Sequence, residues 1–224
     1  RDALDEGATV EASKGVVRGY SAGAAIEIRF VTRGSGSYSE SWTEVEAAVD
    51  TRGLLLALRR QTPEEESLVR EGLAVDLQTG DDVFDHAFVV EAAPADVVLA
   101  LLTPEIREGL LALRNVALRT GEAGVRLEQP AWVKDGARLR AMAVLAAKVA
   151  LGVPAARASV DLVTAGYRGP ARGGDGRPQR EVEALRKIQA AREMALARRG
   201  CASAALIFLV AIAFSALVAL LRAR

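Results

Sequence analysis

Hydrophobic and polar residues alternate in two stretches in the first quarter of the chain, and a mostly apolar stretch follows them. Over residues 24–32, apolar Ile26 and Ile28 alternate with charged residues, which is the period of a β-strand with one buried face. Residues 42–49 and 54–59 read as two further strands. Because turn-forming residues separate the three stretches, they predict an antiparallel meander.

Later segments change to helical spacing. Thr103, Pro104 and Glu105 supply an N-cap, a proline at the first helical position and an acidic first turn. Asp135 precedes a longer apolar stripe that we expect to end near Pro154. Shorter elements complete the pattern, with helix starts at Pro63 and Pro94 and strand candidates at residues 73–77, 84–90, 117–119 and 125–127.

These elements predict an α+β fold. We expect an antiparallel sheet of five to seven strands with two or three helices on one face, formed by residues 24–160. Residues 1–23 are rich in glycine, alanine, serine and charge without a sustained period, so we predict a flexible lead-in. Residues 161–180 have the glycine, proline and arginine content of a linker.

An uncharged run of 21 residues, CASAALIFLVAIAFSALVALL, occupies residues 201–221. A helix rises about 1.5 Å per residue, so this run would span roughly 30 Å, the thickness of a bilayer's hydrocarbon core. The alternative is a buried core helix, which is rarely this long without a polar interruption. We therefore predict a C-terminal transmembrane helix. Its small residues are compatible with a homo-oligomer formed through this helix and the stem before it.

The net charge is zero, but the two signs are separated along the chain. Residues 1–165 carry seven more acidic than basic side chains, whereas residues 166–200 carry five more basic than acidic ones. An acidic domain argues against a nucleic-acid partner. By the positive-inside rule, a basic juxtamembrane helix at 181–200 orients the domain towards the cytoplasm. The membrane-orienting residues are Arg186, Lys187, Arg192, Arg198 and Arg199.

Composition favours a reducing, bacterial setting. Cys201 is the single cysteine, so no intrachain disulfide can form. Arginine outnumbers lysine 25 to 4, as expected of a GC-rich bacterial genome. We therefore expect a single-pass protein of the bacterial inner membrane, with the lipid bilayer and an unidentified protein as its partners. The predicted orientation applies to a chain with no further span before Arg1.

One cluster of residues contains side chains of the kinds that bind metal ions. Asp81, Asp82, Asp85 and His86 lie within six residues, a spacing that makes them candidate metal ligands. The spacing does not match an EF-hand loop, and one histidine without a second histidine or a cysteine does not build the usual zinc site. The structural alternative is a turn in which the aspartates cap backbone amides before a strand.

Catalytic motifs are absent from the sequence. There is no GxxxxGK[ST] phosphate loop, no GxSxG nucleophile elbow and no complete dinucleotide fingerprint. Accordingly, we assign no catalytic residue and no cofactor; a binding role is favoured over an enzymatic one, and the enzymatic alternative stays open.

Residues 79–113, TGDDVFDHAFVVEAAPADVVLALLTPEIREGLLAL, contain the pairs Gly80-Asp81 and Phe84-Asp85, then Phe88 and the stretch Leu102-Thr103-Pro104-Glu105. This block resembles one found in uncharacterised bacterial membrane-associated proteins. The resemblance implies a small α+β domain accompanied by membrane helices, and it implies no activity.

Three functions follow from these observations. The first is a membrane-anchored, cytoplasm-facing binding or scaffolding module. The second is a membrane-bound hydrolase that uses Asp81, Asp82, Asp85 and His86. The third is a module that senses anionic lipids through its basic stem.

Overall fold

The structure, a computed structural model, describes residues 4–34, 39–166, 183–192 and 194. Eight antiparallel strands form one sheet in the order β1-β2-β3-β4-β8-β7-β5-β6. The strands are β1 (Glu6–Glu11), β2 (Val16–Ser21), β3 (Ala24–Arg33), β4 (Glu40–Ala48), β5 (Leu55–Arg60), β6 (Phe88–Ala93), β7 (Ala117–Thr120) and β8 (Gly124–Pro130).

Five α-helices and one 3-10 turn, η1 (Ala12–Lys14), accompany the sheet in the described chain. The helices are α1 (Pro63–Arg70), α2 (Asp82–Ala87), α3 (Ala95–Leu101), α4 (Pro104–Leu113) and α5 (Gly136–Gly166). Residues 183–192 form a further helical segment, which we call the stem segment. Thr62 and Thr103 accept hydrogen bonds from Glu65 N and Ile106 N, so the caps of α1 and α4 confirm the helix starts expected from the sequence.

The core begins as one row of apolar side chains that crosses six strands. Register places Ile28, Val45, Leu127, Leu118, Leu58 and Val90 in successive strands from β3 to β6. Each is at most 1% exposed. Because alternate residues of a strand share a face, this row commits one face of these six strands to burial.

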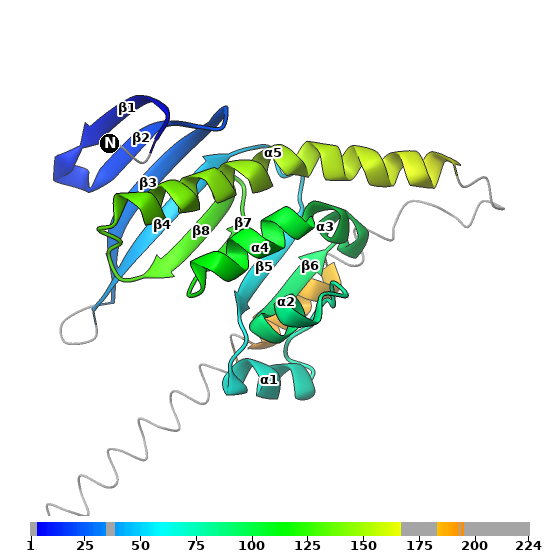
Figure 1. Cartoon of the computed structure of the whole chain (residues 1–224). Helices are drawn as coiled ribbons and strands as arrows, with labels where there is room; N and C mark the ends of the chain where they lie inside the picture. Colours follow the sequence, from blue (N-terminus) through cyan, green and yellow to red (C-terminus); the bar gives the residue numbers. More distant parts are fainter. Residues whose placement is uncertain (1–3, 35–38, 167–182, 193, 195–224) are drawn as a thin grey trace, which may run out of the picture.

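Helices cover that apolar face. α5 lies across the strands, with α3 and α4 packed beside it (Figure 1). Met142, Ala146, Val149 and Val153 of α5 are fully buried. This helix, over Gly136–Asp161, is the one described helix long and apolar enough to cross a membrane, and half of its most apolar stretch is buried inside the domain. Its packing against the sheet gives it the role of a core helix. The predicted span at 201–221 lies outside the described residues.

The structure confirms the α+β class and the antiparallel sheet, and it corrects several details. The sheet has eight strands where five to seven were expected, and the helices number more than the two or three expected. Residues 6–21 are not a flexible lead-in but form β1 and β2, because β2 pairs with β3 over six residues. A strand expected from residue 84 starts at Phe88, since Asp81 caps the short helix α2. Residues 73–77 form no strand.

The last core helix is also longer than expected. It continues through Pro154 to Gly166, so the first residues of the predicted linker are helical. Arg157, beyond the proline, donates hydrogen bonds to the carbonyl oxygens of Thr51 and Arg52 at 2.8 and 3.0 Å. A proline removes one hydrogen bond from the helix backbone. Beyond Pro154, the contacts of Arg157 and the burial of Ala156 hold α5 against the domain.

Candidate functional site

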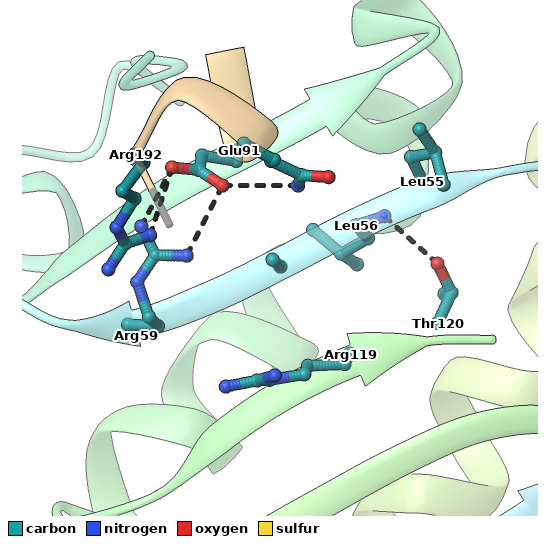
Figure 2. A pocket seen from close by; sticks show the side chains of 9 residues that line it. Leu55, Leu56, Arg59, Glu91, Arg119, Thr120 and Arg192 are labelled. Carbon is teal, nitrogen blue, oxygen red and sulfur yellow. Dashed lines mark hydrogen bonds and ion pairs between the residues drawn. The ribbon is translucent and has the colours of Figure 1, made fainter. Parts of the chain in front are cut away.

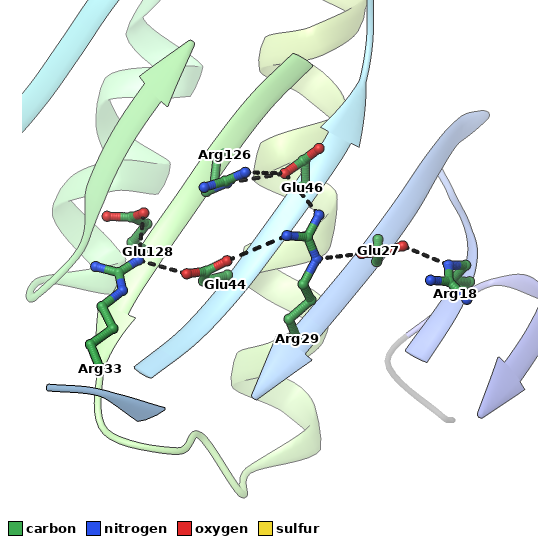
Figure 3. Close-up of polar contacts among 8 residues, drawn as sticks. All are labelled: Arg18, Glu27, Arg29, Arg33, Glu44, Glu46, Arg126 and Glu128. Atoms are coloured by element: carbon green, nitrogen blue, oxygen red, sulfur yellow. Dashed lines mark hydrogen bonds and ion pairs between the residues drawn. The ribbon is translucent and has the colours of Figure 1, made fainter. Parts of the chain in front are cut away.

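The second face of the sheet carries charge, and no described α-helix covers it over β2, β3, β4 and β8. Arginine and glutamate side chains from neighbouring strands meet there in a continuous network, which we call the charged face (Figure 3). The network contains Arg18, Glu27, Arg29, Arg33, Glu44, Glu46, Arg126 and Glu128. Strand alternation explains it, because these residues point away from the apolar face.

Close ion pairs join the strands of the charged face. Nη2 of Arg33 lies 2.6 Å from Glu44 and 2.8 Å from Glu128, so it links β3 to both β4 and β8. Nη2 of Arg126 lies 2.7 Å from Glu46. Such pairs between neighbouring strands each stabilise a sheet modestly, and a network of them contributes more than isolated pairs.

The network has two layers. Glu44, Glu46 and Glu128 are 9, 12 and 5% exposed, whereas Arg33 and Arg126 above them are 38 and 37% exposed. Burial alone would raise the pKa of Glu27, but hydrogen bonds from Arg29 and Arg18 lower it below the ordinary value. The outer layer therefore offers guanidinium groups whose charges are balanced by carboxylates beneath.

A shallow hollow of about 470 Å³ interrupts the charged face near β1. Its floor is made by small residues, among them Gly19, Ala25 and Ala48, and Arg18 and Arg29 border it. Tyr20, which also lines it, is 53% exposed. The hollow therefore combines an exposed aromatic ring with guanidinium groups.

The stem segment packs at the opposite end of this face, over β5 and β6 (Figure 2). Its Leu185 is buried at 4% exposure. Arg192 donates to Glu65 of α1 at 2.7 Å and to Glu91 of β6 at 3.4 Å, and Gln189 donates to Glu91 at 3.2 Å. The stem thus buries one apolar side chain and is joined to α1 and β6 by polar and charged contacts.

Arg59 completes this buried cluster, which we call the stem clamp: Arg59, Glu65, Glu91 and Arg192. Arg59 bonds Glu91 at 2.8 Å and Glu65 at 2.9 Å. Glu91 is only 1% exposed, and the other three side chains are 12 to 16% exposed. Burial would lower the pKa of Arg59, but hydrogen bonds to Glu91 and Glu65 raise it above the ordinary value. Two positive and two negative groups are therefore buried together.

The cluster of aspartates and His86 predicted from the sequence makes hydrogen bonds to the nearby backbone and to Arg107. Asp81 caps α2 through Phe84 N and lies 3.0 Å from Nε of Arg107. Asp85 accepts hydrogen bonds from the backbone nitrogens of Thr79 and Gly80, and His86 Nδ1 lies 2.7 Å from the carbonyl oxygen of Asp82. Within the described ranges, no group of three histidine, cysteine, aspartate or glutamate residues is placed to hold a metal ion.

The basic residues predicted to orient the chain in a membrane have different environments in the structure. Arg186 and Lys187 are exposed on the stem segment, whereas Arg192 belongs to the stem clamp. Arg198 and Arg199 lie outside the described residues.

Sequence reasoning found the alternation of apolar and charged residues but missed the ion pairs that join the strands of the charged face, and it missed the stem clamp. One signal was available: Glu91 follows the apolar run Phe88–Val90, where a charge is expensive unless it is paired. Its partners lie 32 and 101 residues away, and no local pattern identifies them.

No protein-family model matches this chain, and a search of curated proteins found no relative.

Proposed function

We propose that the chain is a membrane-anchored, cytoplasm-facing binding module whose charged face receives a partner protein. The observation that carries the proposal is the hollow beside Tyr20, on the part of the sheet face over β2, β3, β4 and β8 that no described α-helix covers. Antiparallel sheets commonly have one face packed on the core and the other face open to solvent. Aromatic residues and arginine, which surround this hollow, are enriched at protein interfaces.

The chemistry of the face indicates the kind of partner. Carboxylates beneath the arginines balance their charge, so the face lacks the uncompensated positive potential that a nucleic-acid backbone needs. A protein segment that places one apolar side chain over Ala25 and Ala48, with neutral polar groups facing the Arg–Glu pairs around them, would match it.

The stem supports a position close to the bilayer. If residues 201–221 span the membrane, nine peptide units separate them from Arg192 in the stem clamp. A fully extended chain covers about 3.5 Å per residue, so the β5–β6 end of the sheet would lie within about 30 Å of the membrane. Partner proteins at the membrane surface would then be within reach of the charged face.

Site-specific photo-crosslinking in membranes tests the binding function. A photoreactive phenylalanine analogue at Ala48, in the hollow, should give discrete crosslinked products with a partner. The same analogue at exposed Glu108 of α4, on the helix layer, is the matched control. Identical products at both positions, or none at Ala48, would contradict the proposal.

Protease accessibility tests the orientation separately. With a tag at the N-terminal side, the domain should be digested in inverted vesicles and protected in right-side-out vesicles. Digestion only in right-side-out vesicles would reverse the proposed topology while leaving the binding function open to the crosslinking test.

A second candidate, recognition of anionic lipids, is favoured by exposed Arg186 and Lys187 on the stem segment. Flotation with vesicles should then weaken as salt rises, because screening shortens the reach of exposed charges. For the hydrolase hypothesis, the contacts of Asp81 and Asp85 give no support, since both carboxylates already bond backbone amides.

A further inference from the structure

A pocket of about 330 Å³ lies between the stem segment and the sheet (Figure 2). The sheet contributes Arg59, Glu91, Arg119 and Thr120, and the stem contributes Gln189 and Arg192. Neither part forms the pocket alone, so its shape depends on the stem being docked.

Strand register explains why a hollow exists there. Ala57 of β5 pairs with Glu91 of β6 on one side and with Arg119 of β7 on the other. Directly opposed residues of a sheet lie about 5 Å apart, so a methyl group between two long side chains leaves space above it. Ala57 and Leu55 thus give the pocket an apolar floor, and its rim is charged.

The charges of the rim do not cancel. In the stem clamp, Glu65 and Glu91 balance Arg59 and Arg192. Arg119 stands outside this balance: its side chain is 56% exposed, and its ion pair is a loose one, 3.8 Å from Glu128. Glu128 already accepts a bond of 2.8 Å from Arg33.

A second arginine lines this pocket. The Arg192 side chain is 16% exposed, and its Nη atoms bond Glu65 and Glu91. An oxyanion in the pocket would meet Arg119 and would lie close to Arg192. It would also lie near Glu91, but Arg59 and Arg192 already neutralise the charge of that carboxylate.

We propose that this pocket binds a small organic oxyanion, a phosphate monoester or carboxylate whose apolar part rests on Leu55 and Ala57, and that its binding holds the stem on the sheet. The volume fits a small organic ligand. Guanidinium groups bind phosphate and carboxylate through paired hydrogen bonds. Because residues of the docked stem complete the pocket, the ligand and the docked stem stabilise each other reciprocally. This inference does not rest on the charged face or its partner.

Titration of the full chain in nanodiscs of zwitterionic lipid tests the site, with phenyl phosphate and benzoate as probes. At least one probe should bind and should slow hydrogen exchange of residues 183–192. Arg119→Ala should weaken that binding at least tenfold, whereas Arg70→Ala, an exposed arginine of α1, should leave it unchanged. No slowing of exchange by either probe, or equal affinity in Arg119→Ala, would overturn the proposal.

A second variant separates the pocket from its charge. Ala57→Leu keeps every arginine but fills the hollow, so it should also abolish probe binding, while a melting curve confirms that the domain still folds. Unchanged probe affinity in Ala57→Leu would overturn the site.

The source of the anion is distinguished by lipid composition. If phosphatidic acid in the nanodisc competes with phenyl phosphate, and Arg119→Ala abolishes the competition, the natural ligand class is a lipid headgroup. Competition by phosphatidic acid that persists in Arg119→Ala would count against the site. If phosphatidic acid leaves phenyl phosphate binding unchanged, the pocket takes a soluble phosphate or carboxylate.

Discussion

The stem clamp gives the sharpest prediction about this molecule. Replacing Glu91 with alanine leaves the guanidinium groups of Arg59 and Arg192 with Glu65 as their shared counter-ion. Removing one partner of a buried ion pair costs about 3–5 kcal/mol, because the remaining charge is buried without compensation. Glu91 is 1% exposed and accepts from three side chains, so we expect a loss of about 3 kcal/mol, at the lower end because Glu65 remains.

Part of this loss should appear as release of the stem. About 3 kcal/mol corresponds to roughly a 100-fold change in an equilibrium constant. Hydrogen exchange followed by mass spectrometry on the full chain should therefore show faster exchange at residues 183–192 in Glu91→Ala. Glu64→Ala is the matched control, because Glu64 is an exposed glutamate one residue before Glu65 on the same helix.

Arg192→Ala distinguishes stem release from general destabilisation. Arg192 lies on the stem segment, and its partners in the domain are Glu65 and Glu91. In the variant, both glutamates still have Arg59 as an ion-pair partner. Exchange should rise at residues 183–192 and stay unchanged in β3, β4 and β8. The reasoning is refuted if exchange of the stem segment is the same in wild type, Glu91→Ala and Arg192→Ala.

Three further predictions follow from other parts of the domain. At Gly124 the backbone has φ of +144°, and a Cβ would meet the carbonyl oxygen of Ala47 at 2.1 Å. Gly124→Ala should therefore lower the free energy of unfolding, measured by urea titration, by about 2 kcal/mol or more. Gly121→Ala is the control, because a Cβ there would meet no atom within 4 Å, and it should leave the free energy of unfolding unchanged. Bonding to Phe84 N and Arg107 lowers the pKa of Asp81 below its ordinary 3.8, so its stabilising contribution is present above that pH and is lost as pH falls through the folded-state pKa. The stability difference between wild type and Asp81→Asn should be constant from about pH 5 to 8 and shrink below about pH 4, and a difference that grows on acidification would contradict this. Leu58→Ala, at a fully buried position in the row that crosses the sheet, should cost about 2–5 kcal/mol in the same titration, and Leu151→Ala at a half-exposed position should cost much less.

Local patterns predicted the elements whose signals are contained within a few residues. Ile26 and Ile28 alternate with charge, and they lie on the buried face of β3. The Thr103 cap and the Pro104 start of α4 also appear as expected, because capping is decided by the neighbouring backbone amides.

The charged candidates show where local reasoning fails. Asp81, Asp82, Asp85 and His86 stand out because they are close in sequence. In the fold, Asp81 caps a short helix and pairs with Arg107, Asp85 accepts from backbone amides, and His86 contacts a backbone carbonyl. The stem clamp draws Arg59, Glu65, Glu91 and Arg192 from four elements, so no spacing in the sequence predicts it.

By itself, the sequence determined the α+β class, the alternation that separates an apolar face from a charged one, and the caps that begin the helices, because each is set by interactions within a few residues. Tertiary structure decided which strands became neighbours, so that β4 pairs with β8, 75 or more residues away, and residues 6–21 joined the sheet. It also decided that α5 passes Pro154 and that Arg192 meets Glu91. These outcomes depend on packing and charge pairing between distant segments, whose free energies exist only once the chain has brought those segments together.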